Sequence, residues 1–283
     1  MKRTLAVIAI LALNTLAAAI VSGQTINLKV SDSLLALNQK WAAAYKTTHP
    51  TADIRVSADT AAAAFVALAA KQAEVVIVPR SMRYQEAQAC TAALGSRPTE
   101  AKLAVNGLAV YVNSNNPVAE LNYNELYQIF HGESKNWKEF DGGKDQAISI
   151  YVLSTNAVPG ELFNAEVMSG RGFAAEAHVV AGSDLLKALA ADPQAIGFGA
   201  LSAADGVKLM SIKRAPSSTP VLPTEDNIAK QIYPIARCVF SYSSPAAADG
   251  SSQYLDWIRG AEGQRVAREA GFYALPAASR STP

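Results

Sequence analysis

The segment from residue 153 to residue 163 contains side chains that could hold an anion. It lies between a β-rich run and a helical run, so it forms a strand-to-helix turn. The first turn of a helix has unpaired backbone N–H groups and a partial positive charge, and both favour a bound oxyanion. The candidate donors here are Ser154, Thr155 and Asn156. The same turn includes Pro159, which has no N–H group, and no arginine lies between Ile148 and Gly170.

Other reactive side chains do not form recognisable catalytic or metal motifs. No nucleophile with a neighbouring base, pair of catalytic carboxylates or metal motif is visible, so the sequence predicts neither an enzyme nor a cofactor. His49, His131 and His178 each lack a second ligand three or four residues away, which argues against structural zinc. Cys90 and Cys238 could form a disulfide or remain two buried thiols.

The composition is typical of a folded globular protein. The chain has 283 residues, of which 50% are hydrophobic and 17% charged, and its net charge is +1. These values argue against a disordered chain and against a nucleic-acid surface.

The N-terminus has the pattern of a cleavable secretory signal. Lys2 and Arg3 precede a short apolar run, Leu5 to Leu13, and small residues follow as far as Gly23. We therefore expect residues 1–23 to be a signal peptide, with an uncleaved anchor as the alternative. No later run is long enough to span a membrane, so we expect a periplasmic or secreted protein that does not span the membrane after cleavage. No cysteine lies directly after the apolar run, which argues against lipid attachment.

The rest of the chain alternates short apolar runs with amphipathic ones, which predicts an α/β fold. Strands at 26–30, 53–56 and 74–78, with helices at 34–45 and 60–70 between them, predict a βαβαβ unit with parallel strands. A further apolar run covers 103–112. Beyond it we expect helices at 124–130, 161–168 and 253–270, the last capped by Ser251 and Ser252, and strands at 148–152, 195–200, 207–212 and 233–242.

Several motifs in this order resemble the periplasmic phosphate-binding proteins of ABC uptake systems. Residues 126–132 with Asn136-Trp137 are similar to the family signature L-x-x-I-F-x-G…N-W, and residues 105–110 resemble its domain-crossing strand. The other matching segments are 195–199, 223–227, 233–237, 255–257, 262–264 and 271–272.

The resemblance implies a two-lobed, hinged type II binding protein in which each lobe is a mixed sheet flanked by helices. The first lobe would comprise residues 24–107 plus 240–283, and the second residues 108–239. The cleft between them would capture phosphate or another small oxyanion. A membrane-embedded ABC transporter permease would be the partner.

The resemblance also places binding residues in four loops. The first loop contributes Ser31, Asp32, Ser33 and Leu34, the second Asp59 and Thr60, the third Arg80 and Ser81, and the fourth Ser154, Thr155 and Asn156. Plain helix capping is the alternative role for the first loop, and a solvated side chain is the alternative for Arg80.

Two of these loops depart from the family pattern. Residues 57–64 are rich in alanine where relatives have glycine and serine, and Asp59 would repel a dianion. Leu153, Ala157, Val158 and Pro159 stand where relatives have R-x-x-x-S-G-T. These departures leave a second hypothesis open, a divergent member that no longer binds phosphate and acts as a sensor, scaffold or interaction protein.

Overall fold

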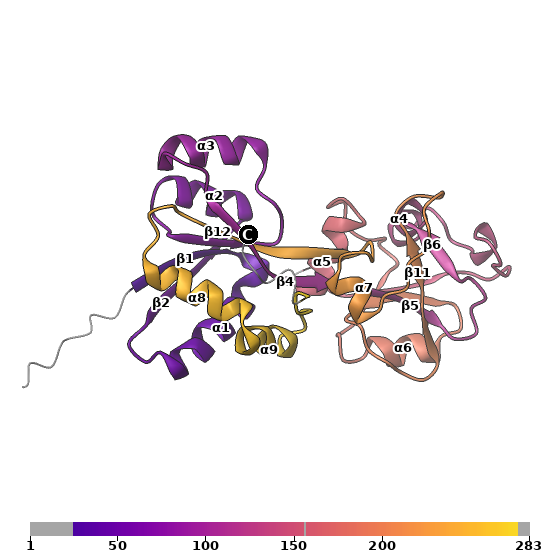
Figure 1. Ribbon diagram of the computed structural model, residues 1–283. Helices are drawn as coiled ribbons and strands as arrows, with labels where there is room; N and C mark the ends of the chain where they lie inside the picture. The colour runs from indigo at the N-terminus through magenta and orange to yellow at the C-terminus, as the bar shows by residue number, and fades with distance from the viewer. Residues whose placement is uncertain (1–24, 156, 277–283) are drawn as a thin grey trace, which may run out of the picture.

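The computed structural model of the protein describes residues 25–155 and 157–276. The predicted signal peptide and the candidate donor Asn156 lie outside these residues. The described chain forms two lobes side by side, each built on its own five-stranded sheet (Figure 1).

The sheet of the first lobe has the strand order β2-β1-β3-β12-β4. Its strands are β1 (Thr25–Ser31), β2 (Asp53–Asp59), β3 (Val75–Val78), β4 (Thr99–Gly107) and β12 (Ala236–Ser243). β1 pairs in parallel with both β2 and β3, which confirms the predicted βαβαβ unit. β12 is antiparallel to β3 and β4, so the sheet is mixed. All four residues of β3 are buried, because helices cover both faces of the sheet.

Helices pack on both faces of this sheet. The 3₁₀ turn η1 (Asp32–Leu34), α1 (Leu35–Thr48), α8 (Asp249–Arg259) and α9 (Ala261–Glu269) lie on one face, and α2 (Ala61–Ala69) and α3 (Tyr84–Leu94) on the other. α3 is absent from the sequence prediction. The single final helix predicted at 253–270 is wrong, since Gly260 is extended and divides it. The predicted cap at Ser251-Ser252 is also wrong, since α8 begins at Asp249.

The sheet of the second lobe is also mixed, with the order β10-β5-β9-β7-β8. Its strands are β5 (Ala109–Asn113), β7 (Ser149–Val152), β8 (His178–Val179), β9 (Ala195–Gly199) and β10 (Val207–Leu209), and a small sheet pairs β6 (Glu120–Asn122) with β11 (Ser211–Lys213). The strand predicted at 207–212 is therefore two strands in different sheets. They separate at Met210, which is fully buried and whose N–H group bonds to the carbonyl of Val110.

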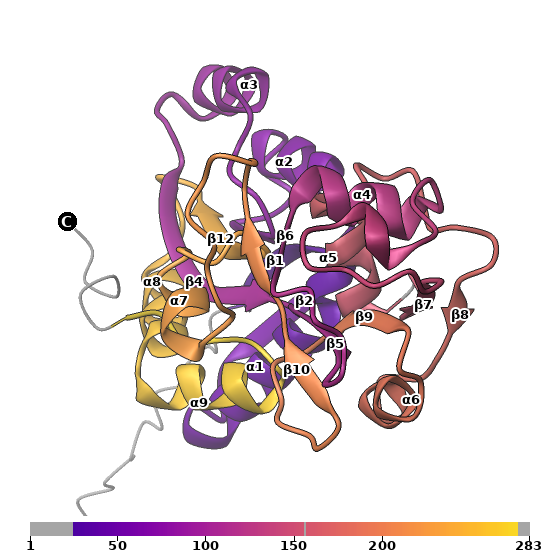
Figure 2. The same cartoon turned by 90° about the vertical axis from the view of Figure 1, so that its right-hand side faces the viewer.

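Five helical segments accompany the second sheet. They are α4 (Tyr123–His131), the 3₁₀ turn η2 (Trp137–Glu139), α5 (Val158–Glu166), α6 (Leu185–Ala191) and α7 (Glu225–Ala229). α4 and α6 lie on opposite sides of the strands (Figure 2). Phe163 of α5 stacks on Phe198 of β9 at 3.9 Å between ring centroids, which anchors α5 to the sheet.

Over the part of the chain that the structure describes, the backbone passes between the lobes at two adjacent points. The apolar run at 103–112 is two strands, β4 and β5, divided at Leu108. The N–H group of Leu108 bonds to the carbonyl of Ile235, immediately before β12. The strand predicted from Tyr233 starts only at Ala236, and residues 236–239 pair with β4 of the first sheet. The predicted boundary between the two lobes, which separates residue 239 from residue 240, stays a prediction.

Both cysteines are buried free thiols, which is the second of the two alternatives left open by the sequence.

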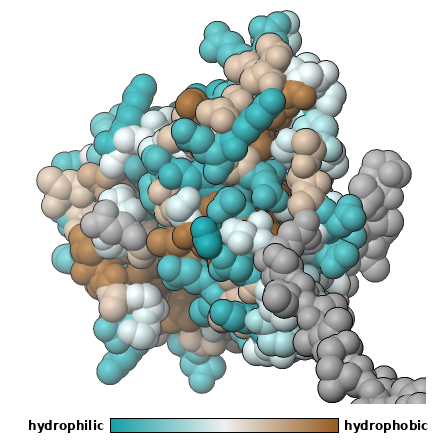
Figure 3. Space-filling model, turned by 90° about the vertical axis from the view of Figure 1, so that its left-hand side faces the viewer, coloured by the Kyte–Doolittle hydropathy of each residue, from teal (hydrophilic) through white to brown (hydrophobic). Residues whose placement is uncertain are grey.

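On the outer face of the first lobe, hydrophilic residues cover most of the surface and hydrophobic ones gather in smaller areas (Figure 3). Within the described residues, no helix is both long and apolar enough to cross a bilayer.

Candidate functional site

The predicted loops of the first lobe lie at one edge of its sheet. β1, β2 and β3 are parallel, so their carboxyl ends meet at that edge. Ser31 is in register with Asp59, and Val30 with Ile77, three residues before Arg80. The fold therefore brings together the strand ends that carry these candidates, although their side chains have different roles.

The first loop faces the second lobe across a cavity of about 520 Å³. Its walls are η1 and the start of α1 on one side and the start of α5 on the other, and its lining residues are Asp32, Ser33, Leu35, Ala36, Gln39, Thr155, Ala157, Val158 and Glu161. We call this space the interlobe cavity. Asp32, Ser33 and Thr155 are the predicted site residues that the structure brings together. Ser31 and Leu34 are buried behind them, and the side chain of Ser31 makes no cap bond to η1.

The interlobe cavity adjoins a second cavity of about 260 Å³, which shares Ser33, Ala36 and Val158 with it. Apolar side chains such as Leu108, Pro159 and Phe272 dominate its walls, and Lys40 is its only lysine or arginine among the described residues. Both parts of the cleft have largely apolar walls, and the interlobe cavity adds Asp32, Ser33 and Thr155 as polar residues on its two sides.

The turn before α5 is tightly folded. α5 begins at Val158, three residues earlier than predicted, with Pro159 in its first turn. The N–H group of Ala157 bonds to the carbonyl of Ser154 at 2.9 Å. A Cβ atom on Gly160 would lie 2.1 Å from that same carbonyl oxygen. The carbonyl is packed against the helix start, so only a glycine fits at position 160.

The second loop serves as a helix cap. The hydroxyl of Thr60 accepts a hydrogen bond from the N–H group of Ala63 at 3.2 Å and so caps α2. The N–H group of Thr60 donates to the carboxylate of Asp59 at 2.8 Å. Lys29 lies 3.5 Å from the same carboxylate and partly offsets its negative charge. Neither Asp59 nor Thr60 lines the interlobe cavity.

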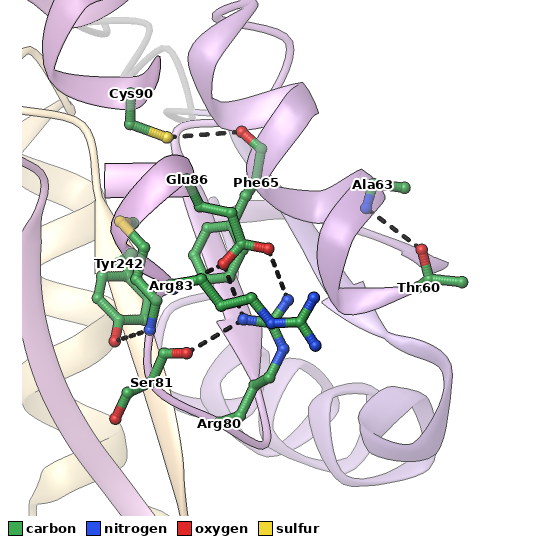
Figure 4. A network of polar contacts seen from close by, with 10 residues as sticks. Thr60, Ala63, Phe65, Arg80, Ser81, Arg83, Glu86, Cys90 and Tyr242 are labelled. Carbon is green, nitrogen blue, oxygen red and sulfur yellow. Dashed lines mark hydrogen bonds and ion pairs between the residues drawn. The ribbon is translucent and has the colours of Figure 1, made fainter. Parts of the chain in front are cut away.

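Arg80 of the third loop is held by a carboxylate of its own lobe (Figure 4). Its two terminal nitrogens donate to the two oxygens of Glu86 at 2.8 and 2.6 Å, and one also donates to the carbonyl of Ser81 at 3.1 Å. The guanidinium carbon lies 5.3 Å from the centre of the Phe65 ring. Arg80 is therefore ion-paired and not merely solvated, and Ser81 contributes its carbonyl to this arrangement. The predicted role of Arg80 and Ser81 in binding an anion stays a prediction.

The pKa of Glu86 reflects this ion pair. Burial raises it, but hydrogen bonds from Arg80 and from the N–H group of Arg83, together with the charges of both arginines, outweigh burial and leave the pKa below its usual value. The hydrogen bond to Glu86 raises the pKa of Arg80 in turn. Both groups are charged at neutral pH, and they neutralise each other.

A second arginine near the cleft is also paired. Arg237 of β12 donates to Glu161 of α5 at 2.5 Å and lies 3.6 Å from Glu166 of the same helix. Its side chain is only 13% exposed. The sequence places Arg237 inside a strand, but its partners belong to a helix 70 or more positions away. The sequence alone did not point to Glu86, Glu161 or Arg237.

The interlobe cavity itself has an acidic character. Asp32 makes no ion pair with any described residue, and Glu161 brings a second carboxylate whose partner is Arg237. Neither lysine nor arginine occurs among the described residues that line this cavity. Hydroxyls and backbone N–H groups are the donors available there, and no cluster of metal-ligating side chains is found within the described residues.

Comparisons with known proteins agree with the two-lobed architecture. A family model described as a PBP superfamily domain matches residues 17–262. The phosphate-binding protein PstS of Pseudomonas aeruginosa is 25% identical over 264 residues, which cover 87% of this chain and 82% of that protein. PstS of Bacillus subtilis is 32% identical over 165 residues, 58% of this chain and 53% of that protein.

Solved structures give the same result. A possible phosphate binding protein from Planctomyces limnophilus superposes with a TM-score of 0.81 at 21% identity, covering 91% of this chain and 95% of that one. An ABC-type phosphate transport receptor from Vibrio cholerae gives a TM-score of 0.69 at 26% identity, covering 89% of this chain and all of that one.

Proposed function

Since the chain belongs to the family of PBP superfamily domains, we propose that it is a solute-binding protein that captures phosphate or another small oxyanion between its lobes. The observation that carries the proposal is the position of Ser33 and Thr155, which face one cavity from the two lobes. Closure of the lobes around the solute would bring both hydroxyls onto it. The names of the relatives, phosphate-binding proteins and a phosphate transport receptor, support this ligand class.

The chemistry of the interlobe cavity favours an oxyanion that still carries a proton. Ser33 and Thr155 can donate hydrogen bonds to its oxygens. The carboxylate of Asp32 can only accept, so it favours a ligand O–H group and repels a fully ionised oxyanion. We therefore expect hydrogen phosphate to bind better than sulfate.

Isothermal titration calorimetry with phosphate, sulfate and other small oxyanions tests the proposal. We expect phosphate to bind, and the variant Ser33→Ala/Thr155→Ala to weaken binding by roughly tenfold or more, because each hydrogen bond to a charged ligand contributes about 1.5–3 kcal/mol. Thr51→Ala/Ser96→Ala, which removes two exposed hydroxyls elsewhere, should leave binding unchanged. Phosphate that binds equally well to both double variants would contradict this site.

A second candidate function is favoured by the pairing of Arg80 with Glu86. That pairing engages the arginine that the family resemblance places among the binding residues, and Pro159 in the first turn of α5 has no N–H group to donate. The alternative is a divergent family member that keeps the two-lobed fold and acts as a sensor, scaffold or interaction protein. Absence of a calorimetric signal across the whole oxyanion panel would favour this alternative.

We also propose export through the signal peptide at residues 1–23 and delivery of the solute to an ABC transporter permease. The type of relative that the chain matches supports delivery to a permease. N-terminal sequencing of the mature protein tests the export proposal, and a start near residue 24 is the expected result. An N-terminus that retains the apolar run would contradict cleavage.

A further inference from the structure

A cavity of about 490 Å³ lies in the second lobe, away from the interlobe cavity. Its lining residues are Tyr123, Asn124, Tyr127, Glu166, Val167, Ser169, Arg171 and Arg214, none of which lines the interlobe cavity. On α5, Glu161 lines the interlobe cavity and Glu166 lines this one, so about 7.5 Å of helix separates the two linings. We propose that this cavity binds a small organic molecule through a phosphate or carboxylate group held between Arg171 and Arg214.

The loop that carries Arg171 is fixed to α5. Its N–H groups at Gly170 and Gly172 donate to the backbone carbonyl and the side-chain oxygen of Asn164, each at 2.9 Å. Ser169, Gly170 and Gly172 have φ values of 51°, 77° and 82°, a conformation that glycine adopts easily and serine rarely. The two bonds to Asn164 hold this turn in place, and Arg171 lies at its tip.

The cationic groups at this cavity are not neutralised by ion pairs. Arg171 donates to the hydroxyl of Tyr127 at 3.0 Å, and its guanidinium carbon lies 5.6 Å from the centre of that ring. Both contacts orient the guanidinium group without cancelling its charge. Arg214 is exposed and makes no hydrogen bond or ion pair with any residue in 25–155 or 157–276. Arg80 and Arg237, by contrast, are both held by carboxylates.

One carboxylate, that of Glu166, also lines the cavity. It lies 3.6 Å from Arg237, so its charge is shared with an arginine outside the lining. The lining therefore has two cations against one carboxylate that is already paired. Asn124 and Ser169 add an amide and a hydroxyl that can donate to anionic oxygens. This charge balance favours an anion, and the planar donors of arginine suit a carboxylate or phosphate group.

The cavity is open to solvent, and its lining extends beyond the two arginines, which leaves room for an organic group beside the anionic one. The ring of Tyr123 offers apolar surface for the organic part of the ligand, and its hydroxyl is fixed by a 2.7 Å bond to the carbonyl of Pro234. The ring of Tyr127 is already in contact with Arg171 and stacked on His131. This site is separate from the proposed solute site, and its occupation does not require the interlobe cavity.

Titration of the ¹⁵N-labelled mature protein, followed by NMR, tests the proposal. The probes are glycerol 3-phosphate and succinate, which distinguish phosphate from carboxylate, with inorganic phosphate as a third probe. We expect saturable amide shifts at Asn124, Ser169 and Arg171 with an organic probe. The variant Arg171→Gln/Arg214→Gln should weaken the binding at these amides by roughly tenfold or more, because two charge-assisted contacts are lost.

Two further variants make the result specific. Arg97→Gln/Arg268→Gln removes two exposed arginines that form no ion pairs with described residues, and it should leave the affinity unchanged. Ser33→Ala/Thr155→Ala removes interlobe hydroxyls and should also leave these amide shifts unchanged. The proposal is overturned by absent shifts, by equal weakening in both arginine double variants, or by loss of the shifts in the hydroxyl variant. The last result would place the ligand in the interlobe cavity instead.

Discussion

At the scale of single residues, the difference between expectation and structure is clearest at Arg80. The sequence identifies this arginine as a candidate, because it follows a strand end within a recognisable motif. Its partner, Glu86, is six residues away on α3, a helix that the apolar pattern did not predict. A contact of this kind depends on the angle between two elements, which residue spacing does not specify.

The ion pair gives a prediction at this scale. Glu86→Gln should destabilise the protein by about 1–3 kcal/mol, since both side chains are partly exposed and the charge-assisted bonds are lost. It should leave oxyanion binding in the interlobe cavity unchanged, because neither Arg80 nor Glu86 lines that cavity. Glu269→Gln, which removes an exposed partner of Arg265, is the matched control and should change neither property measurably.

The stabilisation by Glu86 depends on pH in a defined direction. Its pKa is lower in the folded protein than its ordinary value of 4.5, so the unfolded chain binds more protons in this range. The contribution is fully present above pH 4.5 and is lost as the pH falls through the folded pKa. Urea unfolding at a series of pH values should show that the wild-type protein has a higher free energy of unfolding than Glu86→Gln, and that this difference shrinks below pH 4.5. An advantage that is independent of pH would contradict the assignment.

The two thiols give a second prediction at the residue scale. Burial raises the pKa of both cysteines, that of Cys238 to about 11, and the thiolate is the reactive form. Ellman's reagent at neutral pH should therefore react slowly with the native protein. After unfolding, both cysteines of each chain should react without prior reduction. A lack of reactive thiols in the unfolded chain would indicate a disulfide and contradict the structure.

At the scale of elements, much of the fold follows from the sequence pattern. The alternation of apolar strands and capped helices places β1, α1, β2, α2 and β3 within a few residues of their observed positions. The wrong predictions of strand and helix bounds share one physical cause. At Leu108, Met210 and Gly260 the chain changes its packing partner inside a run that looks continuous. An apolar run shows that residues are buried, but it does not show which sheet or helix they contact.

Gly160 provides a prediction for the turn before α5. Gly160→Ala should destabilise the protein by about 1–3 kcal/mol, because its Cβ atom would overlap the carbonyl of Ser154. Gly182→Ala is the control, since no atom lies within 4 Å of its added Cβ atom. Denaturant unfolding of the two variants should separate them clearly. Equal stabilities would mean that the turn is less tightly packed than described.

At the scale of the whole molecule, Arg237 joins the two lobes. It comes from β12 of the first sheet and contacts two glutamates of α5, which packs on the second sheet. The sequence resemblance predicted two lobes, but not this contact. A contact between the lobes at this position can limit how far they separate.

Arg237→Gln should therefore destabilise the protein by about 3 kcal/mol, because two carboxylates lose their nearly buried partner. Small-angle scattering should show a larger mean separation of the lobes. Arg265→Gln is a close control, since Arg265 also joins two glutamates, Glu262 and Glu269, but is 48% exposed. Arg265→Gln should lower the free energy of unfolding by at most about 1 kcal/mol and should leave the scattering unchanged. Equal effects in the two variants would contradict the proposed role of Arg237.

The central claim is that the interlobe cavity captures a small oxyanion. A crystal structure of the mature protein grown with phosphate tests it most directly. We expect phosphate between Ser33 and Thr155, within hydrogen-bonding distance of both hydroxyls, with the lobes closer together than in the present structure. An interlobe cavity that holds only water at saturating phosphate, or phosphate bound only elsewhere, would contradict it.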